Sequence, residues 1–187
     1  VATVACQTPE KRVRESRLSN PPIAVPRVYS VTSEPVSFIE SQGVFAEPTT
    51  WFAKPVTPDA TPYLVLLIDD TVVSNAWQAE TQRLAAKGYV VLCLATPSVP
   101  DPSLESRAWG MLLQQAIIFM ESLIETRERA GAVIGYGNAG ARALQVSLIA
   151  PEVNAAVAWS PPPVAAGASI PKPSAQWLVM NPPEELL

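Results

Sequence analysis

The six residues 135-GYGNAG-140 are the stretch of this sequence whose types and spacing point most directly to chemistry. Their glycines match the G-x-G-x-x-G turn that holds the pyrophosphate of a dinucleotide at a helix N-terminus. They also match the sharp strand-to-helix turn that carries a nucleophilic serine in the pattern G-x-S-x-G, except that the serine position is Gly137. The first interpretation predicts a bound cofactor, and the second predicts a turn that has lost its nucleophile.

A dinucleotide site needs a strand before the glycine turn, a helix after it, and usually an acidic residue at the end of the next strand. The strand and the helix are predicted here at residues 132–136 and 138–149, but the next predicted strand, 154–159, ends in Ser160 and three prolines instead of a carboxylate. At least two predicted strand–helix pairs also precede the turn. Nucleotide binding therefore stays an alternative, in which NAD(P) or another nucleotide would be held by Gly135, Gly137 and Gly140.

The sequence contains no histidine. Serine and cysteine hydrolases nearly always use a histidine as the general base, and histidine is also the commonest zinc ligand. The two cysteines, Cys6 and Cys93, are far apart in the sequence and do not suggest a metal cluster. Asp69 and Asp70 could offer oxygen ligands to Ca²⁺ or Mg²⁺, but two adjacent acids without further acidic ligands are more typical of a solvated loop. We therefore predict no metal and no cofactor.

The composition is that of a globular domain. Of the 187 residues 48% are hydrophobic and 16% are charged, and no apolar run reaches the roughly 20 residues that a membrane span requires. The formal net charge of −4 argues against a nucleic-acid surface, because the only basic cluster, residues 11–17, contains an acidic residue as well. We expect no nucleic-acid partner and no transmembrane segment, although the protein could lie at the periphery of a membrane complex.

The residues from 63 onward predict an α/β fold. Apolar runs of strand length alternate with helical patterns, and this order is typical of a mostly parallel, twisted sheet with helices on both faces. The predicted strands are residues 63–68, 89–95, 132–136, 154–159 and 176–180, and the predicted helices are residues 75–87, 101–129 and 138–149.

The N-terminal part is predicted to be less regular. Residues 1–34 show no sustained periodicity and are interpreted as an irregular arm, so that the α/β domain covers residues 35–187. A strand interrupted at Gly43 is expected within residues 36–45, and the proline-rich residues 48–62 are expected to form a loop.

The predicted long helix is apolar around most of its circumference, more than a helix covering one sheet face needs. Its apolar residues could be enclosed by neighbouring elements and the N-terminal arm, or they could form a patch that docks a partner. The candidate partner-binding residues are Trp109, Leu113 and Phe119.

The order of these elements and three of their motifs resemble the α/β-hydrolase superfamily, in particular its dienelactone hydrolase, cutinase, polyester hydrolase and chlorophyllase branch. The motifs are the turn at 135–140, the stretch 84-LAAKGYVV-91, similar to L-A-x-x-G-Y-x-V, and 153-VNAA-156 followed by Pro161. The resemblance covers residues 36–183 approximately. It implies the fold just described, with a Ser–acid–His triad in active members.

Transferred position by position, the resemblance implies a degenerate active site. The nucleophile position is Gly137, and the acid position falls at Pro182, near Glu184 and Glu185, which are expected to be exposed tail residues. The histidine-bearing segment would follow the end of the chain at Leu187. The turn that often carries His-Gly in relatives reads Asp69-Asp70-Thr71 here, which places negative charge near the oxyanion position, while the backbone N–H of Asn138 could survive as a donor.

We therefore predict a catalytically inactive α/β-hydrolase-like protein that serves as a structural subunit bound to other subunits of a larger complex. A lipid- or pigment-binding module is a further alternative, suggested by the chlorophyllase resemblance and five tryptophans at positions 51, 77, 109, 159 and 177. Because the sequence starts at Val1, we expect a targeting peptide to have been removed and the protein to be organellar. The chlorophyllase resemblance favours a plastid over a mitochondrion.

Overall fold

The structure is a computed structural model that describes residues 28–37, 48–69, 73–95, 97, 101–126, 129–159 and 176–180. These residues form one seven-stranded sheet with the strand order β1-β2-β4-β3-β5-β6-β7. Strand β1 pairs antiparallel with β2, β2 pairs antiparallel with β4, and all the other neighbouring strands are parallel. The strands are β1 (Val31–Pro35), β2 (Thr50–Pro55), β3 (Tyr63–Ile68), β4 (Val90–Ala95), β5 (Gly131–Tyr136), β6 (Val153–Trp159) and β7 (Gln176–Met180).

The two central strands explain why this sheet forms. All six residues of β3 and all six of β4 are buried, as expected for parallel strands covered on both faces. Successive side chains point to opposite faces of the sheet, so Val65 and Leu67 belong to one core layer and Leu64 and Leu66 to the other.

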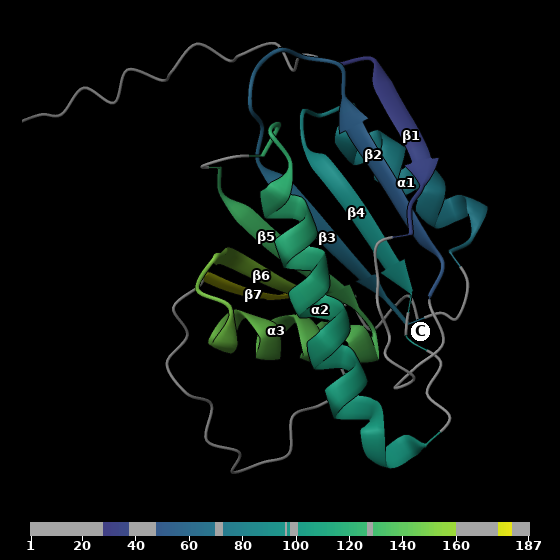
Figure 1. Cartoon of the computed structure of the whole chain (residues 1–187), viewed down its shortest axis with the longest axis vertical. Helices are drawn as coiled ribbons and strands as arrows, with labels where there is room; N and C mark the ends of the chain where they lie inside the picture. The colour runs from purple at the N-terminus through teal and green to yellow at the C-terminus, as the bar shows by residue number, and fades with distance from the viewer. Residues whose placement is uncertain are drawn as a thin grey trace, which may run out of the picture.

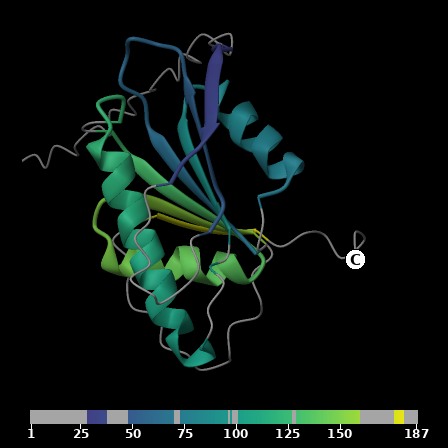
Figure 2. The same ribbon diagram turned by 45° about the vertical axis from the view of Figure 1, so that its right-hand side comes forward.

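Three α-helices cover the sheet: α1 (Asn75–Ala85), α2 (Glu105–Ser122) and α3 (Asn138–Ile149). Helix α1 lies on one face, and α2 and α3 lie on the other (Figures 1 and 2). A 3₁₀ turn, η1 (Pro102–Leu104), leads into α2, and Gly88 adopts the left-handed conformation, with φ of 97°, just after α1. The predicted α/β class, with a mostly parallel sheet and helices on both faces, is confirmed.

Two strands at one edge of the sheet differ from the sequence prediction. Strand β2 lies in the predicted loop 48–62, and β1 begins within the predicted arm 1–34. The prolines around β2 suggested a loop. Pro55, however, is the last residue of β2, where the missing backbone N–H interrupts little of the hydrogen bonding between strands. Residues 36 and 37 follow β1, and the rest of the strand predicted within 36–45 lies outside the described residues.

Helix α2 is shorter than predicted because it ends at Ser122 instead of continuing to about residue 129. Leu123 is extended, with ψ of 136°. The buried hydroxyl of Thr126 folds back and donates hydrogen bonds to the carbonyls of Met120 and Leu123, which lack helical partners at this end. In the part of the chain that the structure describes, no helix is long and apolar enough to cross a membrane.

Candidate functional site

The glycine turn between β5 and α3 has the geometry of a sharp strand-to-helix elbow. Gly137 has a φ of 61°, in the left-handed region that side chains other than glycine rarely adopt. Its N–H donates to the carbonyl of Trp159 at 2.9 Å, and its own carbonyl accepts from the N–H of Gly140 at 2.9 Å. The turn is therefore fixed both to strand β6 and to the first turn of α3.

Gly135 has a packing role that needs no cofactor. A Cβ atom at this position would lie 2.2 Å from the carbonyl oxygen of Ala139, so only glycine allows β5 to pass this close to α3. The first glycine of the G-x-G-x-x-G pattern is thus explained by contact between strand and helix.

Asp69, directly after β3, reaches across to the N-terminus of α3. Strands β3 and β5 are parallel neighbours, so their carboxyl ends meet at the same edge of the sheet. The Oδ2 atom of Asp69 accepts a hydrogen bond from the backbone N–H of Asn138 at 3.1 Å and another from its side-chain Nδ2 at 2.6 Å. A carboxylate in this place caps the helix and interacts favourably with its dipole.

The same carboxylate opposes the chemistry that such an elbow usually performs. In acyl transfer, a backbone N–H at the start of the helix stabilises the developing oxyanion. Here the N–H of Asn138 already donates to Asp69, and a Cβ at position 137 would lie 3.2 Å from Asp69 Oδ2. The sequence correctly placed negative charge at this turn, and the Asn138 amide does act as a donor, but its acceptor here is the carboxylate of Asp69.

A cavity of about 380 Å³ adjoins the elbow. Polar and apolar surface contribute to its wall in similar amounts, and Arg142 forms an ion pair with Glu105 at 3.2 Å and a hydrogen bond to Gln145 at 3.1 Å there. Trp109 is the aromatic residue among the described lining residues, and only 4% of it is exposed. The charged groups in this wall do not favour a lipid or pigment as its ligand.

The comparison with solved structures identifies the architecture. The chain is similar to a putative dienelactone hydrolase from Klebsiella pneumoniae, with a TM-score of 0.60 and 16% sequence identity over 81% of this chain and 72% of that one. The chain has an α/β-hydrolase-like fold. No family model matches the sequence, and no curated protein matches it.

Other predicted active-site positions of the hydrolase-like domain lie outside the described residues. These are Asp70, Thr71, the acid position Pro182, and the nearby Glu184 and Glu185. Within the described residues, no group of three or more acidic, cysteine or histidine side chains could hold a metal ion. Cys93 lies in the core on β4, where burial raises the pKa of its thiol to about 12 and makes it a poor ligand or nucleophile.

The tryptophans whose side chains the structure describes do not gather around one cavity. Trp77 packs on Tyr136 with ring centroids 4.6 Å apart, and Tyr136 lies 6.3 Å from Trp159, all near the α1 face of the sheet. Trp51 packs against the same core layer, whereas Trp109 belongs to the layer beneath α2. The side chain of Trp177 lies outside the described residues. The pattern is typical of packing residues.

The candidate partner-binding residues lie mainly in the core of the hydrolase-like domain. Trp109 is 4% exposed and Leu113 is 2% exposed, while Phe119 is half-buried and packs edge-to-face on Phe52 at 5.7 Å. Packing within the domain accounts for their apolar character. Binding of a partner by this helix stays a prediction, and it would have to use the exposed side of α2 that carries Ile118.

Proposed function

We propose that this protein is a catalytically inactive α/β-hydrolase-like domain that serves as a structural subunit of a larger complex. The observation that carries the proposal is the elbow, where Gly137 takes the nucleophile position and Asp69 occupies the helix amide beside it. An organellar location, plastid ahead of mitochondrion, stays a prediction that accompanies it.

Three requirements of serine-type acyl transfer argue for inactivity. A nucleophile is required, and Gly137 has no side chain. A base is required, and the 187 residues contain no histidine. An oxyanion site is required, and loss of one donor alone typically lowers kcat by about 10²–10³-fold; here the Asn138 amide faces a carboxylate instead.

The structural half of the proposal is supported by what the chain has kept. Strands β3 and β4 are fully buried, and seven buried residues of α2 face the core. The chain keeps the buried residues that hold the fold together but lacks a nucleophile at position 137. This combination favours a role carried by the protein's surface over a reaction at the elbow between β5 and α3.

The two alternatives have weaker support. A dinucleotide would place its pyrophosphate on the N-terminus of α3, where the negative charge of Asp69 would repel it. A lipid or pigment would need an apolar cavity, whereas Glu105, Arg142 and Gln145 line the cavity beside the elbow.

Native mass spectrometry of the protein isolated gently from its source tests the proposal, because one spectrum reports both bound partners and bound small molecules. We expect a large, stable complex in which this subunit has its polypeptide mass. A subunit carrying the added mass of NAD(P), a lipid or a pigment would contradict it, as would a protein that occurs only as a monomer.

A further inference from the structure

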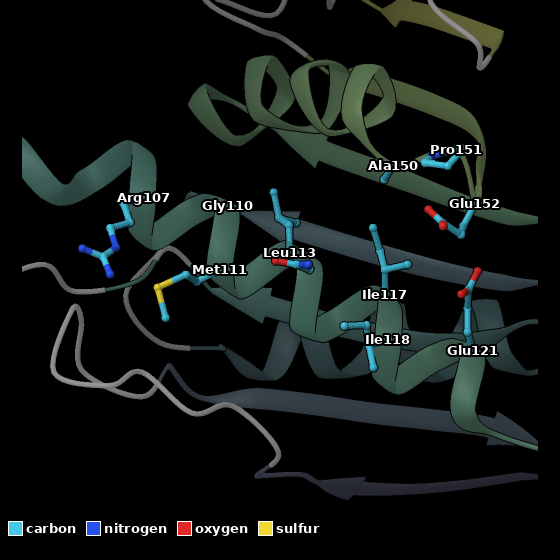
Figure 3. A pocket seen from close by; sticks show the side chains of 11 residues that line it. Arg107, Gly110, Met111, Leu113, Ile117, Ile118, Glu121, Ala150, Pro151 and Glu152 are labelled. Carbon is cyan, nitrogen blue, oxygen red and sulfur yellow. The ribbon is translucent and has the colours of Figure 1, made fainter.

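A groove of about 530 Å³ runs along the outer side of α2, between this helix and residues 150–152 after α3 (Figure 3). The residues of α2 that line it recur at helical spacings of three and four, so they form one face of the helix. They include Arg107, Gly110, Met111, Ile117, Ile118 and Glu121. With a rise of about 1.5 Å per residue, the groove extends for about 20 Å, which is the length of a four-turn helix.

Gly110 makes the floor of this groove unusual. Glycine is unfavourable in the interior of a helix, so its presence normally reflects a close approach of another group. Apart from its chain neighbours and the backbone of its own helix, a Cβ atom at position 110 would meet no atom of the described residues within 4 Å, so packing inside the domain does not require the glycine. The bare backbone instead leaves room for a second helix to approach α2 closely.

The two ends of the groove carry opposite charge. Glu121 and Glu152 lie near one another at one end, and Arg107 lies at the other (Figure 3). Among the described residues, neither Glu121 nor Glu152 forms an ion pair with a lysine or arginine. Burial and the neighbouring charge of Glu152 both raise the pKa of Glu121, as expected for two carboxylates without a cation between them.

Between these charged ends the groove exposes apolar surface. The side chain of Ile118 is 58% exposed, while its neighbour Ile117 is 5% exposed and closes the groove from below. An isolated exposed isoleucine would be unremarkable, but this one lies in a concave site with charge at both ends.

We propose that this groove docks an amphipathic α-helix of a partner protein, lying antiparallel to α2. A small residue of the partner would pack over Gly110, apolar residues would contact Ile118, and a lysine or arginine would lie between Glu121 and Glu152. The antiparallel direction follows because the positive end of the partner helix dipole then faces the two carboxylates. This inference rests on the partner-binding half of the proposed function.

Site-specific photo-crosslinking in the native complex tests the inference. The full chain, with benzoylphenylalanine replacing Ile118, is expressed in the source cells, irradiated, and digested for peptide sequencing by mass spectrometry. We expect adducts with one segment of another protein that has apolar residues at helical spacing and a lysine or arginine at one end. The matched control carries the crosslinker at Val56, which is 59% exposed and lies outside the groove, and we expect no adduct with that segment.

A second variant tests the close approach at Gly110. Gly110→Leu extends a side chain from a position where a Cβ atom has open space, and leucine favours a helix more than glycine, so we expect the melting temperature of the isolated protein to be unchanged or higher. Recovery of the crosslinked partner with the variant should fall at least tenfold, and Glu152→Lys should also reduce it. Undiminished recovery with both variants would overturn the inference.

The crosslinking outcomes also separate this inference from the proposed function. An adduct of position 118 with residues 1–27 of the same chain, with a second copy or with lipid would overturn helix docking, as would the absence of any adduct. If native mass spectrometry still shows the complex in those cases, the structural-subunit proposal stands and only the groove assignment fails. Absence of any complex in native mass spectrometry would contradict both the structural-subunit proposal and the docking of a helix in the groove.

Discussion

Asp69 is the residue whose position has the largest consequence for function. It directly follows β3, yet its carboxylate caps a helix that begins almost seventy residues later. An elbow that performs acyl transfer keeps the amide at the start of its helix available for the substrate, whereas this chain uses the amide for a contact of its own. This contact supports the proposal that the turn serves the fold instead of a reaction.

Removal of that carboxylate should weaken the fold measurably. We expect Asp69→Ala to lower the free energy of unfolding by about 1 kcal/mol, within the range of about 0.5–2 kcal/mol known for lost N-terminal caps. Urea denaturation followed by circular dichroism measures the effect. Asp59→Ala, an exposed acid in a bend, is the matched control and should change the value by less than about 0.5 kcal/mol. Equal effects of the two substitutions would exclude a capping role for Asp69.

At this scale the sequence revealed one half of the site. The strand-to-helix elbow around Gly137 could be recognised because a local pattern of residue types defines it, and its reading as a turn without a nucleophile stays a prediction. The engagement of the Asn138 amide by Asp69 could not be predicted, because it depends on which strands are neighbours and on one side-chain rotamer. Only the pairing of β3 with β5 brings these residues together.

At the scale of elements, α2 combines a buried face with a charged outer edge. Tyr63 lies on the core face of β3, and its hydroxyl donates to Glu121 Oε1 at 3.4 Å, while Glu152 approaches from the turn after α3. Burial is the largest cause that raises the pKa of Glu121, and the charge of Glu152 raises this pKa further. The hydrogen bond from Tyr63 acts in the opposite direction and lowers it.

This raised pKa predicts a dependence of stability on pH. A carboxyl whose pKa is higher in the folded state stabilises the fold below its unfolded pKa, about 4.3, and loses that contribution as the pH rises through the folded pKa. We expect Glu152→Gln to lower the pKa of Glu121 and to lessen the loss of stability between pH 4 and 7. Because both side chains are exposed, the difference should stay below about 1 kcal/mol.

Urea denaturation of the wild type and of Glu152→Gln at pH 4, 5, 6 and 7 measures this effect. The quantity compared is the free energy of unfolding of each protein as a function of pH. Glu34→Gln on β1 serves as the control, because this exposed residue lies outside the groove. The expectation fails if the Glu152→Gln and wild-type curves run parallel throughout the range.

The sequence predicted most of the elements and missed those whose formation depends on distant partners. Strands β3, β4 and β5 are long apolar runs and could be recognised locally. Strand β2 could not, because its prolines favour a loop and its pairing with β4 is invisible in the local sequence. The end of α2 was missed because the extended conformation of Leu123 and the hydrogen bonds of the Thr126 hydroxyl cannot be read from the local sequence.

For the whole molecule, the central sheet is the part that every other element depends on. Strand β4 lies between β2 and β3, with α1 on one face and α2 on the other, and its Cys93 is completely buried. A reagent can therefore reach this thiol only when the domain opens as a unit.

The reactivity of Cys93 should report that global opening. In a Cys6→Ser background, we expect dithionitrobenzoate to label the native protein at least about a thousandfold more slowly than the urea-unfolded protein. Burial, together with the raised pKa of the thiol, is the reason. Labelling at comparable rates, followed by absorbance, would mean that the central strand opens locally and that the sheet is not one cooperative unit.

The hydrolysis of short p-nitrophenyl esters tests the central claim most directly. Folded wild-type protein, Gly137→Ser and a heat-unfolded sample are assayed between pH 6 and 9. We predict that neither folded protein exceeds the unfolded sample, because Gly137 offers no nucleophile, a serine there would have no histidine base, and Asp69 occupies the oxyanion donor. Saturable hydrolysis by the folded wild-type protein that disappears on unfolding would contradict the account.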